Sequence, residues 1–280
     1  MEKEKLMQGV FFLTASASVA LVGLICFFLF SSGLPTIFQL GVDSFLLGQR
    51  WRPNNDIFGI LPMILGSIYI TAGAVVLGVP IGVFTAVFLA HFCPKKIYVW
   101  LKPAVELLAA IPSVIYGFFG LVVLVPYIRE FFGGTGSSIF TAAILLGMMI
   151  LPTIISVTEA TLRAVPSSYY EGALALGADN VRSYFFAVVP AAKSGIFAAI
   201  ILGVGRAIGE TMAVVMVAGN QARMPQGLLE GIRTLTTNIV IEMGYAADLH
   251  RDALLATAVI LFIFILVINM SFVYIKKRAA

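Results

Sequence analysis

The chain has 280 residues, of which 60% are hydrophobic and only 11% are charged. Soluble domains carry about 25% charged residues, so this chain has too few to cover a water-exposed surface of its size, and its apolar excess is expected to face lipid. This composition excludes a soluble enzyme. The formal net charge of +4 does not indicate nucleic-acid binding, because the basic residues are scattered between apolar runs and do not form a stripe with aromatic residues.

The apolar residues are gathered into runs long enough to cross a bilayer. A helix needs about 20 residues to cross a hydrocarbon core about 30 Å thick. We predict an all-α polytopic membrane protein with six transmembrane helices, over 10–30, 61–90, 103–125, 139–157, 195–218 and 253–275. The second run is long and carries Gly78, Pro80 and Gly82 near its middle, which favours one bent or tilted span.

The lysines predict the orientation of the spans. The first apolar run is too long for a signal peptide and no clear cleavage site follows it, so we expect an uncleaved first span. With the N-terminus inside, every lysine falls on the cytoplasmic side: Lys3, Lys5, Lys95, Lys96, Lys102, Lys193, Lys276 and Lys277. The positive-inside rule therefore places both termini in the cytoplasm.

The spans and their connections predict three parts. These are an N-terminal helix with the first outer segment over 1–60, a domain of five transmembrane helices over 61–275, and a basic cytoplasmic tail over 276–280. The outer segments 31–60 and 219–252 are long and carry both acids and bases, which fits either a docking surface or a solvated loop. The isolated cysteines and histidines have no spacing typical of disulfides or metal ligands.

A cytoplasmic segment over 163–193 is too short and too polar to cross the membrane, so we expect it to lie along the surface. Pro166 is expected to end the preceding helix. Ser168 and Glu171 have the spacing of a capping box, which predicts a new short helix there.

The same segment contains the signals that end this helix and begin another. Gly177 is expected to stop the first helix, and a second can begin near Asp179 and should finish before Pro190. Small residues such as Ala173 and Ala175 would let a partner backbone come close. The sequence predicts a protruding pair of helices, with either a coupling or a purely structural role.

These residues resemble the EAA signature of ABC-importer permeases. Glu171, Ala173 and Gly177 keep its spacing, as does Pro190, although Gly172 replaces the first alanine. The resemblance implies a coupling helix that sits in a cleft of an ATPase subunit. The residues expected to make this contact are Glu171, Gly172, Ala173, Leu174, Gly177 and Ala178. The chain has no G-x-x-x-x-G-K-[ST] run, so we expect ATP to be bound by another polypeptide.

The fifth run contains a basic and an acidic residue four positions apart. Arg206 and Glu210 would lie on one face of a continuous helix. An arginine at the bilayer centre costs about 2.5–3.5 kcal/mol, so it is expected to face a cavity or a partner. Gly203, Gly205 and Gly209 leave room beside the pair. The pair is either a structural lock between helices or an anion site, with the guanidinium fork holding an oxyanion and Glu210 holding Arg206 when no anion is bound.

Two strings resemble the PstC-type permease subunit of the phosphate ABC importer: GRAIGETMAVVMVAGN over 205–220 and LLAAIPSVIYGFFGL over 107–121. The resemblance implies a type I (MetI-like) permease fold in a bacterial inner membrane. It also implies a PstA-like second permease, a PstB-like ATPase dimer that binds ATP and Mg, and a PstS-like external phosphate-binding protein. This chain itself is expected to bind no cofactor and to open and close a phosphate path by alternating access.

The same resemblance assigns Arg206 and Glu210 to the passage of phosphate, with Thr211 completing the motif. Ser113 and Tyr116 follow Pro112, so their hydroxyls on a disrupted helix are further candidates for lining the path, or they pack between helices. Sulfate or molybdate is an alternative cargo. A channel or ion-coupled secondary transporter is a further alternative, although we find no convincing internal repeat, and a signalling role is neither supported nor excluded.

Overall fold

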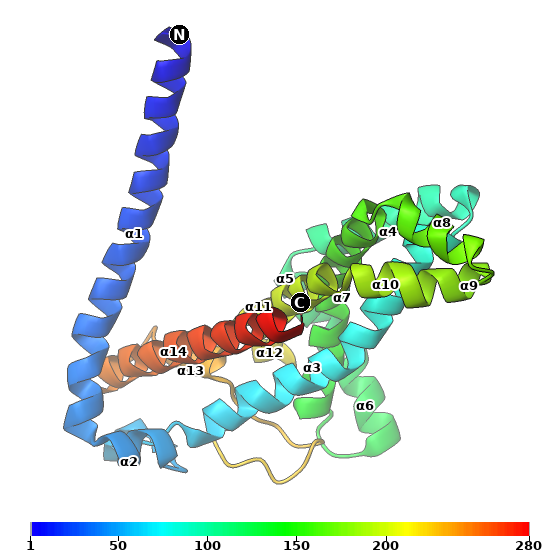
Figure 1. The fold of residues 1–280 in the computed structure, drawn as a ribbon. Helices are drawn as coiled ribbons and strands as arrows, with labels where there is room; N and C mark the ends of the chain where they lie inside the picture. Colours follow the sequence, from blue (N-terminus) through cyan, green and yellow to red (C-terminus); the bar gives the residue numbers. More distant parts are fainter. Residues whose placement is uncertain (1, 280) are drawn as a thin grey trace.

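The computed structural model describes residues 2–279, and side chains over 7–274. Within this range five helical stretches are long and apolar enough to cross a membrane, and a sixth span results if one bent helix pair is taken together. Figure 1 shows these helices as an open, elongated bundle. The five stretches are Met7–Leu40, Leu61–Phe92, Ser113–Phe132, Ile139–Ala164 and Asp248–Tyr274, and the bent pair is Asn180–Ala191 with Lys193–Gly209. The all-α, multi-span prediction is confirmed.

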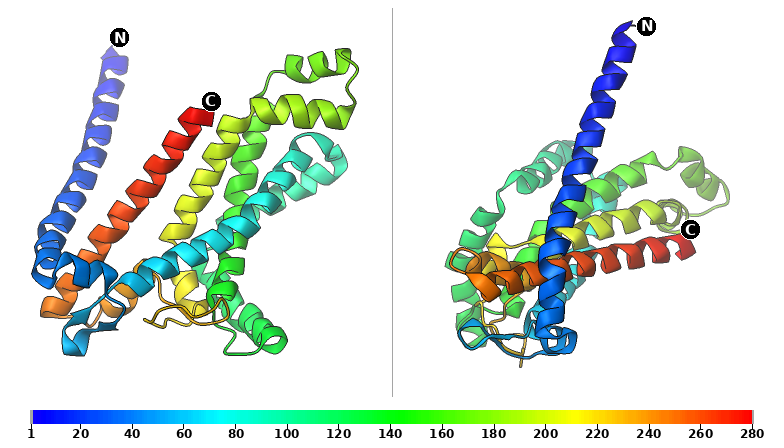
Figure 2. Two further views of the ribbon diagram at one scale, coloured as in Figure 1. Left: turned by 60° about the horizontal axis from the view of Figure 1, so that its bottom comes forward. Right: turned by 90° about the vertical axis from the view of Figure 1, so that its left-hand side faces the viewer.

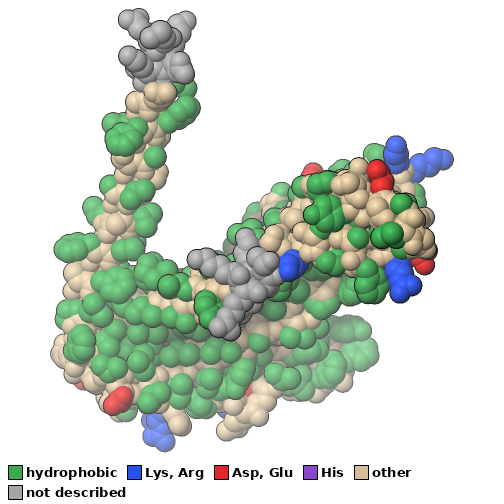
Figure 3. Space-filling model, viewed as in Figure 1, with side chains coloured by type: hydrophobic (Ala, Val, Ile, Leu, Met, Phe, Trp, Pro, Cys, Tyr) green, Lys and Arg blue, Asp and Glu red, His purple; other side chains and the backbone are tan. Residues whose placement is uncertain are grey.

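The two ends of the bundle differ in what they carry. Both chain termini lie at the end that also carries the segment between the fourth and fifth spans, and the two long outer segments lie at the opposite end (Figure 2). On the face shown in Figure 3, charged side chains gather at these two ends and hydrophobic side chains fill the surface between them. This distribution fits a chain whose middle lies in hydrocarbon.

Helix α3 (Leu61–Val87) and helix α7 (Ile139–Ala164) form the centre of the bundle. Small residues let them pack closely: a methyl group added to Gly78 would lie 2.8 Å from Ile150, and one added to Gly82 would lie 2.8 Å from Ile154. α3 continues without interruption into a π-helix, η2 (Phe88–Phe92). The second run is therefore one span, as the sequence predicts.

Helix α1 (Glu2–Leu40) contacts the bundle near its C-terminal end, where Gly33 packs against Leu255 and Val259 of α14 (Asp248–Ala279). α1 continues ten residues beyond the predicted limit of 30, so this part of the predicted outer segment is wrong. The serines that were expected to begin a loop do not interrupt the helix, because the Ser31 hydroxyl donates to Phe28 O at 3.0 Å.

The rest of the first outer segment is a compact unit. It contains α2 (Val42–Leu47), β1 (Trp51–Arg52), the 3₁₀-helix η1 (Pro53–Asn55) and β2 (Ile57–Phe58). The two strands pair antiparallel, with Trp51 opposite Phe58.

The third span is displaced from its predicted position. Helix α4 (Lys95–Ala110) ends before Pro112, and the span consists of α5 (Ser113–Phe119), the π-helix η3 (Gly120–Leu124) and α6 (Val125–Phe132). The predicted limits of 103–125 are wrong because Ile111 precedes a proline and adopts an extended backbone (φ −65°, ψ 125°). Glu106 therefore lies on α4, outside the span.

The fifth run is also interrupted. Helix α11 (Lys193–Gly209) ends at Glu210, whose backbone is extended (φ −69°, ψ 131°), and α12 (Met212–Val217) follows after Thr211. The predicted continuous helix over 195–218 is wrong at this point. The chain then crosses an irregular stretch to α13 (Leu235–Glu242).

The fourth and sixth spans are longer than predicted. α7 continues to Ala164, seven residues past the predicted limit, and α14 begins at Asp248. α14 also continues to Ala279, so the predicted boundary at 275 is not a break in the helix. The side chains of the predicted basic tail over 276–280 lie outside the described residues.

Candidate functional site

Arg206 lies near the end of α11 and is partly buried. Its Nη1 donates to the Thr153 hydroxyl of α7 across 3.4 Å, a long contact with an uncharged group. The guanidinium also interacts electrostatically with the Tyr116 hydroxyl of α5. The structure therefore brings Arg206 and Tyr116, both predicted site residues, to the same region between α5, α7 and α11.

Tyr116 is buried, and its hydroxyl donates to Leu108 O of α4 at 2.9 Å. This bond joins α5 to α4 across the break at Pro112. Ser113 is the first residue of α5 and is partly buried. The two residues thus differ. The Tyr116 hydroxyl already donates to a backbone carbonyl, which favours helix packing, one of the two roles predicted for it, over lining of the path.

The expected pairing of Arg206 with Glu210 is wrong. The ion pairs within the described part of the chain do not include these two residues. Contact at i and i+4 requires a continuous helix, and α11 ends one residue before Glu210. The Glu210 Oε1 instead accepts from the backbone N–H groups of Thr211 (3.1 Å) and Ala213 (3.3 Å), at the start of α12.

The break itself is held by hydrogen bonds. The Thr211 hydroxyl donates to Gly209 O at 3.2 Å, and the Thr236 hydroxyl of α13 donates to Glu210 O at 3.2 Å. Sequence reasoning missed Thr236. The signal was a capping box, because Thr234 and Thr237 bond reciprocally at the start of α13 and so place Thr236 in the first helical turn.

The glycines beside Arg206 have two different roles. A methyl group added to Gly203 would lie 3.0 Å from Ile154, so this position serves close packing of α11 against α7. A methyl group added to Gly205 or Gly209 would meet no atom within 4 Å. The prediction of open space next to Arg206 is confirmed at these two positions.

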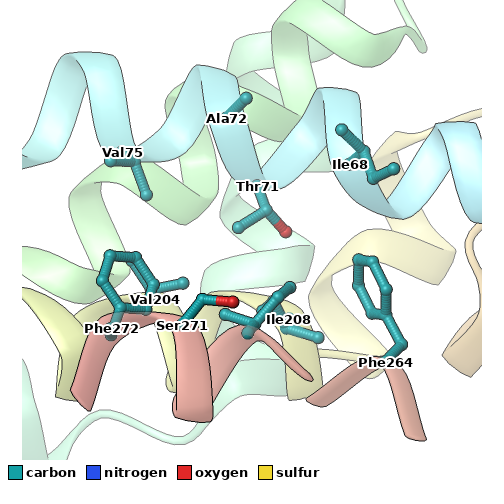
Figure 4. A pocket seen from close by; sticks show the side chains of 10 residues that line it. Ile68, Thr71, Ala72, Val75, Val204, Ile208, Phe264, Ser271 and Phe272 are labelled. Carbon is teal, nitrogen blue, oxygen red and sulfur yellow. The ribbon is translucent and has the colours of Figure 1, made fainter. Parts of the chain in front are cut away.

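An apolar cavity of about 470 Å³ lies on another side of α11 (Figure 4). Its walls come from α3, α11 and α14, and include Thr71, Val204, Ile208 and Phe264. Val204 and Ile208 lie two positions before and after Arg206, about 200° around the helix. Because its lining is almost wholly apolar and omits Arg206, this cavity is not a path for an anion.

The segment between the fourth and fifth spans folds largely as predicted. Pro166 follows the end of α7, and α8 (Ser167–Ala175) follows it. Gly177 has a left-handed backbone (φ 88°); its N–H donates to Leu174 O at 2.9 Å, and the Ala178 N–H donates to Ala173 O at 3.1 Å. These two bonds form a Schellman motif, so the predicted stop is confirmed.

Two details of the same segment are wrong. α8 begins directly after Pro166 with no side-chain cap, because Ser168 already lies inside the helix and cannot act as its N-cap. The second helix begins as predicted, with the Asp179 carboxylate accepting from the Arg182 N–H at 2.7 Å, but it runs past Pro190. It comprises α9 (Asn180–Ser183), the π-helix η4 (Tyr184–Val188) and α10 (Val189–Ala191). The proline is tolerated because it lies in the first turn of α10, where its missing N–H removes no α-helical bond.

The predicted coupling residues lie at the surface. Glu171, Gly172, Leu174 and Gly177 are exposed, whereas Ala173 and Ala178 are partly buried. Leu176, which the sequence analysis did not single out, is 92% exposed. α8 and η4 are anchored to the end of the second span, because the His91 ring lies 4.3 Å from that of Tyr184 and 4.8 Å from that of Tyr170. Leu176, directly after the end of α8, thus adds an exposed apolar side chain to an anchored helix.

A charge cluster around a buried carboxylate, at the same end of the bundle, was also missed. Glu159 on α7 is 2% exposed, and its carboxylate accepts from Tyr98 OH (2.8 Å), Lys102 Nζ (3.0 Å) and Arg163 Nε (2.9 Å). Arg163 Nη2 also donates to Leu89 O at 2.8 Å. The sequence pattern that could have revealed this cluster is the i, i+4 pair Glu159 and Arg163, which lies beyond the predicted end of the fourth span.

The carboxylate changes the titration of the two α4 residues. The hydrogen bond to Glu159, followed by burial, raises the pKa of the Tyr98 hydroxyl. Burial alone would lower the pKa of Lys102, but the hydrogen bond and charge of Glu159 outweigh it, so the net pKa is raised. Both groups therefore keep their protons at neutral pH, and both can donate to Glu159.

A second charge cluster lies in the outer segments. The Glu242 carboxylate forms an ion pair with Arg233 and hydrogen bonds with Trp51 Nε1 (2.8 Å) and His250 Nε2 (2.7 Å). It borders a polar cavity of about 560 Å³ that is also lined by Arg52. This cluster joins the β1–β2 hairpin to α13 and α14, so the two outer segments form one surface.

The fold defines a class: a multi-span helical membrane protein with an anchored, exposed pair of helices between two of its spans. Residues 78–280 match the family described as binding-protein-dependent transport system inner membrane component, and the chain belongs to this family. It is therefore an inner-membrane permease of an ABC importer, a class that works with an ATPase and a substrate-binding protein.

Individual relatives cover nearly the whole chain. A probable ABC transporter permease protein, YqgH, of Bacillus subtilis is 38% identical over 94% of this chain and 86% of that protein. The phosphate transport system permease protein PstC of Mesorhizobium japonicum is 34% identical over 92% of this chain and 86% of that protein. The resemblance to PstC-type permeases is confirmed.

Solved structures support the fold. A chain of the MetNI methionine ABC transporter, in an inward-facing conformation, gives a TM-score of 0.66 at 19% identity and covers 82% of this chain and 100% of that chain. A chain of a bacterial ABC transporter that imports alginate gives a TM-score of 0.65 at 15% identity, over 94% of this chain and 95% of that chain. The predicted MetI-like fold is confirmed.

Proposed function

We propose that this chain forms half of the translocation path of an ATP-driven phosphate importer. The observation that carries the proposal is the state of Arg206, a cation in a membrane-spanning region whose contact at 3.4 Å is an uncharged hydroxyl and whose neighbours Gly205 and Gly209 face open space. The similarity to PstC proteins supports phosphate as the cargo.

The chemistry of the guanidinium fits this role. A cation in a membrane-spanning region without a carboxylate partner is costly, and a bound anion would offset that cost. The planar fork of N–H donors matches two oxygens of a tetrahedral oxyanion. Glu210 does not neutralise Arg206, because its carboxylate caps α12. The cation is therefore available to the cargo in this conformation.

The proposal also assigns the other subunits of the transporter. A PstA-like permease would complete the path on the open side of Gly205 and Gly209. A PstB-like ATPase dimer, which binds ATP and Mg, would receive α8, and a PstS-like protein would deliver phosphate to the outer segments. This arrangement places α8 and both termini in the cytoplasm, in agreement with the distribution of the lysines. ATP-driven closure of the ATPase would then move α8 and open the path outward.

Uptake of labelled phosphate into vesicles that contain the whole complex tests the proposal. We expect Arg206→Gln to lower ATP-dependent uptake about 100-fold without changing assembly. Arg206→Lys should recover part of the uptake, because it keeps the charge and loses the fork. Arg129→Gln is the matched control, since Arg129 is exposed on α6. Full uptake by Arg206→Gln would refute the assignment of Arg206.

Another oxyanion is the second candidate, because a guanidinium binds sulfate and phosphate through the same donors. Competition for uptake by unlabelled sulfate and molybdate distinguishes these cargoes. Uptake without any ATP-hydrolysing partner would instead indicate an ion-coupled transporter.

A further inference from the structure

We propose that Glu159 is a positioning residue that transmits the movement of α8 to α5 through helix α4. The inference rests on the proposed function, because it requires an ATPase that moves α8. It assigns a role in transport to Glu159, Tyr98 and Lys102, which lie outside both the path at Arg206 and the surface of α8.

The first step is the connection from α8 to the cluster. Arg163 lies three residues before Pro166, which joins α7 to α8. Its Nε and Nη2 bind Glu159 and the Leu89 carbonyl, at 2.9 and 2.8 Å. Arg163 therefore fixes the end of α7 both to Glu159 and to the end of the second span, so displacement of α8 acts directly on this cluster.

The second step is the connection from the cluster to α4. Glu159 binds Tyr98 and Lys102, which lie one turn apart on α4 and turn their polar groups toward α7. The opposite side of α4 is apolar and open: Trp100 is 80% exposed and Leu107 is 68% exposed. Tyr98 and Lys102 therefore hold α4 against α7 through the Glu159 carboxylate, while an apolar side of α4 stays exposed.

The third step is the connection from α4 to the path. The Leu108 carbonyl, near the end of α4, accepts from Tyr116 OH of α5 at 2.9 Å across the break at Pro112. Tyr116 in turn lies within electrostatic reach of Arg206. A shift of α4 is thereby passed to the helix that faces the candidate anion site.

The composition of the cluster argues for a role beyond stability. A buried carboxylate with its charged partners is often no more stable than well-packed apolar side chains of the same volume. An apolar contact already exists beside Glu159, among Ala86, Leu89, Val105 and Ile155. The charged and polar groups add directional hydrogen bonds, which at 2.8–3.0 Å fix the position of α4 relative to α7. Directional bonds transmit a small displacement that an apolar contact would absorb by sliding.

The test compares transport with ATP hydrolysis in vesicles that contain the whole complex. Lys102→Met removes one donor and leaves Tyr98 and Arg163 on Glu159. We expect this variant to hydrolyse ATP, and the amount of phosphate carried per ATP hydrolysed to fall at least about threefold. Lys102→Arg should restore the ratio, because it replaces the donor. Lys95→Met is the matched control, since Lys95 is an exposed lysine of the same helix.

A second readout follows the helices directly. Spin labels on exposed residues, at Ser168 of α8 and at Val114 of α5, are each paired with a label at Val76 of α3, after Cys26 and Cys93 have been replaced by alanine. Trapping the ATPase with ATP and vanadate should change both distances in the otherwise unaltered protein. In Lys102→Met the α8 distance should still change, and the change at α5 should be lost.

Each outcome decides the inference. An unaltered transport ratio together with an unaltered α5 movement in Lys102→Met overturns it. If Lys102→Met does not assemble, Tyr98→Phe decides in its place, because it removes a single hydroxyl and must show the same loss. If vesicles with the unaltered protein carry no phosphate, the proposed function fails. The spin-label distances need ATP and vanadate but no phosphate transport, so they still support or overturn the role of Glu159.

Discussion

The Thr236 hydroxyl donates to the Glu210 carbonyl at 3.2 Å and so fastens the interruption between α11 and α12 to the first turn of α13. Glu210 O would otherwise be left at the end of a helix without an intrahelical donor. The discontinuity beside Arg206 is therefore held by α13, a helix that ends at Glu242.

Removing this hydroxyl should loosen the interruption. We expect Thr236→Val to lower the free energy of unfolding by about 1–2 kcal/mol, because it removes both the hydrogen bond to Glu210 O and the contact with the Thr234 hydroxyl at 2.9 Å. We also expect it to raise the KM for phosphate uptake. Thr257→Val is the control, because the Thr257 hydroxyl donates to Ala253 O of its own helix, at 2.8 Å. Thermal unfolding in detergent and uptake at graded phosphate concentrations measure the two effects. Equal KM values for the two variants would contradict the link.

The open space at Gly205 makes a second prediction. A methyl group there meets no atom within 4 Å, so Gly205→Leu should insert and fold normally in this chain. Its side chain would project beside Arg206, and we expect uptake to fall about tenfold through obstruction of the path or of the partner permease. Pull-down of the partner separates these two causes. Uptake at the unaltered level would mean that this space is not part of the path.

The control for Gly205→Leu is a glycine in a packed position. A methyl group added to Gly195 would lie 2.1 Å from Thr161, so even Gly195→Ala should reduce the yield of folded protein. Size-exclusion chromatography in detergent compares the two variants. A folded yield of Gly205→Leu as low as that of Gly195→Ala would contradict the assignment of open space.

The sequence predicted the spans better than their interruptions. Hydropathy identifies apolar stretches reliably because lipid imposes the same requirement on each of them. Hydropathy carries no information on the breaks at Ile111 and Glu210, because each lies within a predominantly apolar run. Ile111 could have been found from the proline that follows it. Glu210 could not, since its extended backbone depends on a carboxylate cap on α12 and on Thr236, a residue distant in the sequence.

In the candidate site too, features that depend on local sequence were predicted and features that depend on the fold were not. Arg206 was predicted because a cation in an apolar run is conspicuous, whereas its separation from Glu210 follows from the break. The Glu159 cluster was missed because Tyr98 and Lys102 are far from Glu159 in the sequence, and only the fold of α4 against α7 brings them together. Local signals such as Gly177 and Asp179 gave correct helix limits, because each acts on backbone groups within three residues of itself.

The charge cluster around Glu242 predicts that loss of a single charge strongly destabilises the outer segments. Glu242→Gln should destabilise the outer segments by about 3–5 kcal/mol, because it leaves the Arg233 guanidinium largely buried without its carboxylate. Glu230→Gln is the matched control: its partner Arg223 is exposed, and such a pair contributes less than about 1 kcal/mol. Limited proteolysis of the outer segments at increasing temperature measures the difference. Equal protease resistance of the two variants would contradict a structural role for Glu242.

The Tyr98 hydroxyl predicts how the anchoring of α4 depends on pH. Its pKa is raised, chiefly by donation to Glu159, so the protonated form is favoured in the folded protein. A group with a raised pKa contributes its full stabilisation below its unfolded pKa, about 10 for tyrosine, and loses it as the pH rises through the folded value. The stability difference between the unaltered protein and Tyr98→Phe should therefore be constant from about pH 6 to 9 and shrink above about pH 10. Thermal unfolding across this range measures it, and a difference that varies between pH 6 and 9 would show that another group controls the bond.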